Sequence, residues 1–152
     1  MHAIEKMLKI GDIIFFLAII LCLSNTVLFA ADANDILGLW LSEAHDGRIR
    51  IYRCGEEYCG DIVWSRNAPE FDVNNPDADL RNRRIIGLNI MHGFRYAGDD
   101  EWKGGEVYDP QSGHTYKGRM KLVSHDILDL HGYVLIPLFG RSSTWTRIKE
   151  DK

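Results

Sequence analysis

The sequence predicts an all-β fold: an eight-stranded antiparallel up-and-down barrel with one long loop at about residues 66–84. Three observations predict it. Downstream of residue 37, apolar and polar residues alternate with a period of two, in short runs rich in Ile, Val, Tyr, Trp and Thr. Short clusters of Gly, Pro, Asn and Asp separate most of these runs. No segment after the first thirty residues has the pattern of an amphipathic helix.

The first element, residues 1–30, is predicted to be a secretory signal peptide. Lys6 and Lys9 precede an apolar run of eleven residues at 13–23, and cleavage is expected after Ala30. The alternative is an uncleaved membrane anchor, but crossing a bilayer takes about 20 apolar residues. The shorter run therefore favours a cleaved signal.

Cleavage would leave a short N-terminal segment, residues 31–37, and one domain, residues 38–148. The removed segment carries two basic and two acidic residues, so the net charge of the chain stays at −4. A mildly acidic surface has no electrostatic footprint for nucleic acid or for an anionic membrane. We expect an exported protein, periplasmic or secreted, with no nucleic-acid partner and no stable membrane insertion after cleavage.

The domain is expected to contain eight consecutive strands. Their short connections make successive strands antiparallel neighbours, and closing eight of them into a barrel removes the exposed sheet edges. Glycines inside several runs suit bends at barrel corners. The expected strands cover residues 38–43, 47–54, 58–65, 85–95, 101–108, 114–123, 127–135 and 141–148.

The second and third strands are expected to form a hairpin with Cys54 directly opposite Cys59. Because an exported protein meets an oxidising compartment, we expect these cysteines to form a disulfide on the polar face. Two free thiols are one alternative; a zinc site would need a second pair of ligands. The same register pairs Ile51 with Ile62 and Ile49 with Trp64 on the apolar face.

The connection at residues 66–84 is long and polar. Loops of this length in a compact domain often act as lids or binding elements. Asp77 or Asp79 is expected to cap a short helical turn here. The loop also offers groups for an anionic headgroup or carboxylate at the barrel mouth, unless its arginines pair with neighbouring aspartates. The candidates are Asn75, Asp77, Arg81, Arg83 and Arg84.

Several short motifs follow one another along the chain. Among them are Gly-Leu-Trp at 38–40, Gly-Asp-Ile-Val-Trp at 60–64, Asn-Pro-Asp at 75–77, Trp-Lys-Gly-Gly at 102–105 and Thr-Trp-Thr-Arg at 144–147. The ordered set resembles a bacterial family catalogued as domain of unknown function 2147. This resemblance implies a lipocalin-like (calycin) barrel and a family without an assigned activity.

A lipocalin-like fold implies structural roles for Gly38, Trp40 and Arg147. The tryptophan would close the barrel floor while the guanidinium packs across its ring, a cation–π contact of about 1 kcal/mol. Two residues depart from the family pattern: Arg84 stands where a proline is expected, and His131 precedes Gly132 in place of the usual residue.

An eight-stranded barrel is just wide enough to be filled by side chains or to hold one small ligand. Several residues, mostly aromatic, could line an apolar pocket with a few polar tips, or could simply fill the interior. These candidates are Trp64, Phe94, Trp102, Tyr108, Tyr116 and Met120.

No cofactor or metal is expected. Four residues of the long loop resemble a calcium loop, but the glycine and the final glutamate of that motif are missing. The alternative is that a wall histidine, His92 or His131, ligates a haem. The loop residues are Asp72, Asn74, Asp77 and Asp79.

Catalysis has no support, because the sequence lacks a nucleophile elbow, a Walker loop and a dinucleotide fingerprint. An enzyme using a mouth carboxylate, Asp77 or Glu106, is the weakest hypothesis. The leading hypothesis is an exported barrel that binds a small, partly apolar ligand. Its rival is an envelope interaction module with a filled barrel, which meets a protein partner through its outer surface or residues 66–84.

Overall fold

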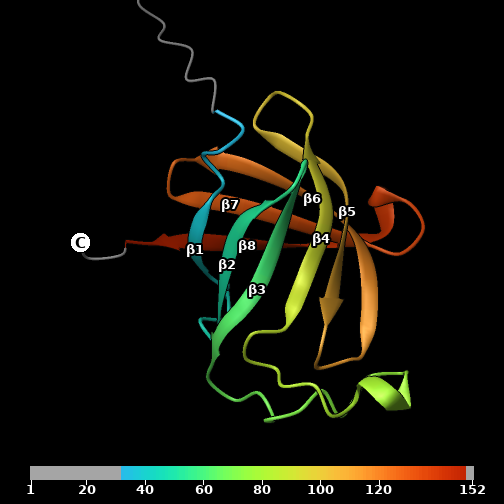
Figure 1. Cartoon of the computed structure of the whole chain (residues 1–152). Helices are drawn as coiled ribbons and strands as arrows, with labels where there is room; N and C mark the ends of the chain where they lie inside the picture. Colours follow the sequence, from blue (N-terminus) through green and yellow to red (C-terminus); the bar gives the residue numbers. More distant parts are fainter. Residues whose placement is uncertain (1–31, 150–152) are drawn as a thin grey trace, which may run out of the picture.

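The computed structural model of the protein describes residues 32–149. They form a closed antiparallel barrel in which each strand pairs with the next and β1 pairs with β8 (Figure 1). Two short 3-10 helices, η1 (Ala78–Leu80) and η2 (Pro137–Phe139), lie in connections. The strands are β1 (Gly38–Leu41), β2 (Gly47–Cys54), β3 (Glu57–Ser65), β4 (Asn89–Tyr96), β5 (Glu101–Asp109), β6 (His114–Ser124), β7 (Ile127–Tyr133) and β8 (Gly140–Ile148).

The predicted fold class is therefore confirmed: the barrel has eight strands in up-and-down order. The predicted signal peptide lies outside the described residues. Within residues 32–149, no helix has the length and apolar character that crossing a membrane requires.

The start of β4 corrects the predicted strand at 85–95. The chain turns at residues 85–88, where Gly87 has a φ of 90° and the Leu88 N–H donates to the Ile85 carbonyl at 3.1 Å. Only glycine adopts such a φ readily, so this apolar run forms a turn and the strand begins at Asn89. Ile85 and Leu88 are nevertheless buried in the core.

The β2–β3 hairpin contains the Cys54–Cys59 disulfide, but its register differs from the prediction by two residues. Cys54 lies opposite Glu57, and Cys59 lies opposite Tyr52. The cause is a two-residue turn that begins with Gly55 at a φ of 73°, which brings the strands together earlier than expected. A shift of two residues preserves the faces of a strand, so the disulfide still lies on the outer, polar face.

The predicted pairing of Trp64 with Ile49 is also wrong. Ile49 lies opposite Ile62, and an irregularity in the register then places Trp64 opposite Arg48. The Arg48 guanidinium lies 4.8 Å from the centre of the Trp64 ring. Trp64 is half-buried beside this exposed cation and does not belong to the core cluster.

One end of the barrel is closed by a tryptophan and an arginine, at the place where its first and last strands pair. Trp40 lies opposite Arg147, whose guanidinium lies 4.2 Å from the Trp40 ring centre. Arg147 also donates to the carbonyls of Leu37 at 2.6 Å and Asp35. A side chain at Gly38 would press against the same guanidinium, because an added Cβ would lie 3.0 Å from Nη1.

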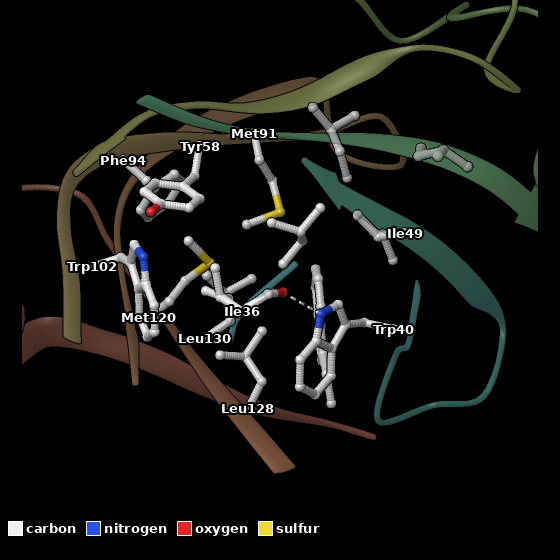
Figure 2. Close-up of a cluster of buried hydrophobic side chains, with 14 of the residues drawn as sticks. Ile36, Trp40, Ile49, Tyr58, Met91, Phe94, Trp102, Met120, Leu128 and Leu130 are labelled. Carbon is white, nitrogen blue, oxygen red and sulfur yellow. Dashed lines mark hydrogen bonds between the residues drawn. The ribbon is translucent and has the colours of Figure 1, made fainter. Parts of the chain in front are cut away.

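The interior next to this closed end is filled with apolar side chains (Figure 2). The indole N–H of Trp40 donates to the Ile36 carbonyl at 2.9 Å, so the N-terminal segment inserts into the core. Fully burying each large apolar side chain contributes about 1.5–3 kcal/mol. These buried side chains therefore contribute much of the apolar stabilisation of the barrel.

Candidate ligand-binding site

The opposite end of the barrel, called the mouth here, is where four connections meet. In an up-and-down barrel, alternate connections lie at the same end. The mouth connections are residues 42–46, 66–88, 110–113 and 134–139. Figure 1 shows the segment at 66–88 below β3 and β4, and the segment at 134–139 between β7 and β8.

A cavity of about 690 Å³ opens at the mouth over the ends of β5, β6, β7 and β8. Ligand pockets typically have volumes of about 300–1,000 Å³. Leu130 belongs both to this cavity and to the buried core, so the core forms the cavity floor. The lining consists of Val107, Asp109, Tyr116, Leu130, Gly132, Tyr133, Val134, Gly140, Arg141 and Ser143.

Strand alternation explains how these residues reach the interior. Side chains two residues apart share one face, so Arg141 and Ser143 lie on the same face of β8 as the buried Trp145. Gly132 lies directly opposite Arg141 on β7. Because Gly132 has no side chain, space remains between Arg141 and Tyr116; a Cβ added at Gly132 would lie 3.6 Å from the Tyr116 Cβ.

Several polar groups face this space. Among residues 32–149, neither the Arg141 guanidinium nor the Tyr116 hydroxyl has a hydrogen-bond or ion-pair partner. Ser143 Oγ accepts from the Trp145 indole at 3.0 Å, and its own hydroxyl proton remains available. The Asp109 carboxylate is used within its turn, because it accepts from Ser112 Oγ at 2.6 Å and from the Gln111 N–H at 2.9 Å.

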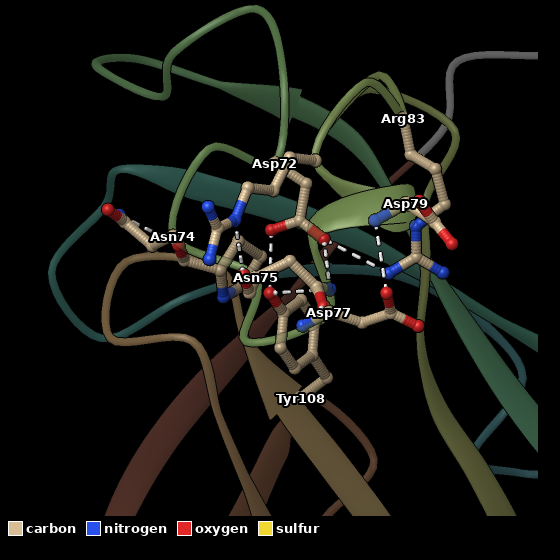
Figure 3. A network of polar contacts seen from close by, with 9 residues as sticks. Asp72, Asn74, Asn75, Asp77, Asp79, Arg83 and Tyr108 are labelled. Atoms are coloured by element: carbon tan, nitrogen blue, oxygen red, sulfur yellow. Dashed lines mark hydrogen bonds and ion pairs between the residues drawn. The ribbon is translucent and has the colours of Figure 1, made fainter.

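A buried polar network lies elsewhere at the mouth, in the segment at 66–88 (Figure 3). The Asp72 carboxylate is fully buried and accepts three hydrogen bonds. They come from the Tyr108 hydroxyl at 2.6 Å, Asn75 Nδ2 at 2.8 Å and Arg83 Nη2 at 3.0 Å. The network joins the loop to β5 and satisfies a charge that would otherwise be costly to bury.

This network shifts two pKa values. Burial raises the pKa of the Asp72 carboxyl, but the hydrogen bonds from Tyr108, Asn75 and Arg83, with the Arg83 charge, outweigh burial and hold this pKa below its ordinary value. Burial, followed by the hydrogen bond and negative charge of Asp72, raises the pKa of Tyr108 to about 12. Asp72 is therefore a carboxylate and Tyr108 a neutral hydroxyl near neutral pH.

The predicted mouth residues lie together, but their polar groups are engaged within the loop. Arg83 bonds to Asp72, Arg81 Nε donates to the Asn75 carbonyl at 2.8 Å, and Asp77 Oδ1 caps η1 by accepting from the Asp79 N–H at 3.0 Å. Arg84, the departure from the family pattern, makes a 3.1 Å ion pair with Glu70. These contacts correspond to the alternative in which the loop's charges pair with one another.

The six predicted lining residues are divided among different surroundings. Phe94, Trp102 and Met120 lie deep in the filled core (Figure 2). Tyr108 belongs to the Asp72 network, and Trp64 packs beside Arg48. Of the six, Tyr116 is the one that lines the 690 Å³ cavity.

The two histidines considered for haem do not face the interior. His92 is exposed and lies 3.6 Å from Glu106, the other carboxylate considered for catalysis. His131 is engaged on both ring nitrogens, with Ser142 Oγ at 2.9 Å and the Pro137 carbonyl at 2.7 Å. Within residues 32–149, no three His, Cys, Asp or Glu side chains are grouped to hold a metal ion. Asn74, the remaining residue considered for a calcium site, donates from its side-chain amide to the Gln111 carbonyl at 2.9 Å.

Sequence reasoning missed Arg141, Ser143 and Gly132 as cavity residues. A usable signal was present, because counting back in steps of two from Arg147 through Trp145 places Ser143 and Arg141 on the inner face. The opening between these strands could not be found in this way, since it depends on Gly132 lying opposite Arg141.

The sequence model of a family described as "Uncharacterized protein conserved in bacteria (DUF2147)" matches residues 38–147. The chain belongs to this family. The match confirms the predicted family and extends over all eight strands of the DUF2147 barrel except the last residue of β8.

A solved structure similar to this DUF2147 protein is described as "Protein HP1028 from the human pathogen Helicobacter pylori belongs to the lipocalin family". The two superpose with a TM-score of 0.70 at 20% sequence identity, over 76% of this chain and 84% of that chain. At this identity the comparison shows a shared lipocalin-like fold. Comparison with curated proteins finds no match.

Proposed function

We propose that this DUF2147 protein is an exported barrel that binds a small, partly apolar ligand at its mouth. The cavity of about 690 Å³ is the observation that supports the proposal most strongly. Barrels of eight strands can hold one small ligand, and lipocalin-like folds often do so.

The lining matches an amphipathic ligand. Leu130 and Val107 offer an apolar floor and wall, while Tyr116, Ser143 and Arg141 offer polar groups near the rim. A pocket with mostly apolar walls and a few polar groups binds the ligand body through burial and orients it through hydrogen bonds.

Export is the second part of the proposal. The Cys54–Cys59 disulfide supports it, because such bonds persist in oxidising compartments. Fractionation of cells expressing the full chain tests it. Export predicts a shortened, disulfide-bonded protein in the periplasm or medium, whereas a full-length reduced protein in the cytoplasm would contradict it.

We further propose that the protein is a binder without catalytic activity. The buried carboxyl at the mouth, Asp72, supports this view because three donors already surround it. Turnover of a compound that enters the cavity would overturn this part. The rival function, an interaction module with a filled barrel, is less well supported because the mouth retains a cavity and the loop's arginines are engaged internally.

Filling the cavity tests the binding proposal. Gly132→Val places its side chain next to Tyr116, where the first added carbon meets ordinary contact distances. We expect the neutral fluorescent probe N-phenyl-1-naphthylamine to bind the wild type saturably. The variant should bind it about tenfold more weakly, because overpacking costs about 1–3 kcal/mol and 1.4 kcal/mol is tenfold in affinity.

The control is Thr115→Val, which places the same valine side chain one residue from Tyr116 but on the exposed outer face of β6, where it only replaces a hydroxyl by a methyl group. It should bind the probe as the wild type does, and thermal unfolding should show both variants folded. A wild type that does not bind the probe saturably, or a Gly132→Val variant that binds it equally well, would overturn the assignment of the cavity as the site.

A further inference from the structure

Arg141 is the charged group at the mouth cavity that the surrounding residues leave unengaged. It lies on the inner face of β8 at the rim, and no carboxylate of the described chain pairs with it. By contrast, Arg147, six residues further along the same inner face, bonds to three backbone carbonyls. Both arginines come from one strand face, but one closes the barrel and the other is left at the cavity.

We propose that Arg141 binds the carboxylate of an amphipathic monocarboxylate whose apolar body lies over Leu130 and Val107. This inference rests on the proposed function and specifies the class of ligand for the same cavity. A guanidinium presents two parallel N–H groups that match the two oxygens of a carboxylate.

The hydroxyls beside Arg141 complete this recognition. The Tyr116 hydroxyl lines the same cavity without a partner among the described residues, and the Ser143 hydroxyl can donate while its oxygen accepts from Trp145. The apolar floor at Leu130 lies deeper than these groups, since Leu130 is part of the buried core. An apolar chain directed inward with its carboxylate at the rim satisfies both regions.

The negative charge in the lining does not remove this preference. Asp109 also lines the cavity, but its carboxylate accepts hydrogen bonds from Ser112 and from the Gln111 N–H within the 109–113 turn. It is not paired with Arg141. A single guanidinium, with no second cation among the lining residues, fits one carboxylate better than a phosphate, whose sites usually gather more positive charge.

The experiment displaces N-phenyl-1-naphthylamine with dodecanoate, dodecan-1-ol and dodecyl phosphate from the wild type, Arg141→Gln and Arg119→Gln. Arg119 is the matched control, because it is an exposed arginine on the outer face of β6. In the wild type, dodecanoate should bind at least about tenfold more tightly than the alcohol, as expected for a charge-assisted hydrogen bond.

Arg141→Gln should lose about tenfold in dodecanoate affinity while its affinity for the alcohol and the probe changes less than about twofold. Arg119→Gln should match the wild type, and Arg141→Lys should restore only part of the loss, because an ammonium is a point charge without the planar fork. Equal affinities of the wild type for dodecanoate and dodecan-1-ol, or an unchanged dodecanoate affinity in Arg141→Gln, would overturn the inference. Saturable binding of the probe would still support the proposed function in either case.

A tighter binding of dodecyl phosphate than of dodecanoate, lost in Arg141→Gln, would overturn the choice of a carboxylate. Failure of the probe to bind the wild type would overturn the proposed function and this inference together. The two failures are therefore distinguishable.

Discussion

The two longest mouth connections, residues 66–88 and 134–139, are opposite in composition and in burial. The first is rich in charged and amide residues, yet its Asp72 and Asn75 are buried. The second is an apolar run, yet Leu135 is 82% exposed and Leu138 is 81% exposed. Polarity alone would have placed the first in solvent and the second in the core.

The difference lies in how each segment is held. Residues 66–88 are tied to β5 by Asp72 and Tyr108 and to the 109–113 turn by Asn74, which packs so closely that a Cβ at Gly113 would lie 2.1 Å from the Asn74 carbonyl oxygen. Residues 134–139 are held by the His131 contact to the Pro137 carbonyl. Because Val134 lines the cavity, this apolar segment, and not the polar one, borders the proposed ligand.

Breaking the polar network should have the largest effect on the free energy of unfolding. Asp72→Ala would leave the Arg83 guanidinium and the Asn75 amide without their buried acceptor, which should lower stability by about 2–4 kcal/mol. Urea unfolding measures the change. The control Glu70→Ala removes the exposed Arg84 pair and should change stability by less than about 1 kcal/mol. Equal losses in the two variants would show that the network does not hold the loop.

Acid should weaken the same network. The folded-state pKa of Asp72 lies below its unfolded value, which is about 4. The contribution of this carboxylate is therefore fully present above the unfolded pKa and is lost as the pH falls through the folded pKa. The stability difference between the wild type and Asp72→Asn should be largest near neutral pH and shrink below about pH 4. Urea unfolding at a series of pH values measures this difference. A difference that stays constant down to pH 2 would contradict the lowered pKa of Asp72.

The exposed apolar segment should give the smallest effect on stability. A Leu135→Ser/Leu138→Ser double variant removes side chains that are already in solvent, so the free energy of unfolding should change by no more than about 0.5 kcal/mol. Urea unfolding again provides the measurement, with Asp72→Ala as the contrasting case. A loss of several kcal/mol would mean that these leucines pack against the barrel.

The barrel fold could be predicted from the sequence because apolar and polar residues alternate with a period of two through nearly every strand. It misled at residues 85–88, where an apolar run looks like a strand but Gly87 turns the chain. The faces of the β2–β3 hairpin were predicted correctly despite a register error, since a shift of two residues leaves the faces unchanged. Only the irregularity beside Arg48 moved a residue, Trp64, away from its expected surroundings.

The site was harder to predict because it depends on which side chains meet across strands. Aromatic residues at inward positions were reasonable candidates, but Phe94, Trp102 and Met120 pack against each other and fill the closed half. Arg81 and Arg83 were chosen for their charge, which the loop itself uses. Arg141 lies on a strand and not in this loop, and its lack of a neighbouring acceptor is a property that appears only in three dimensions.

The hydrogen bonds of Arg147 to the N-terminal segment have a consequence for the timing of folding. Its hydrogen bonds reach carbonyls 110 and 112 residues earlier in the chain, and contacts over such separations form slowly. On the proposed route of export, a polypeptide threaded through a translocation channel from its N-terminus cannot complete the ring until its last strand has emerged. On this route the Arg147 hydrogen bonds can form only after translocation, so the barrel closes in the compartment to which the chain is delivered.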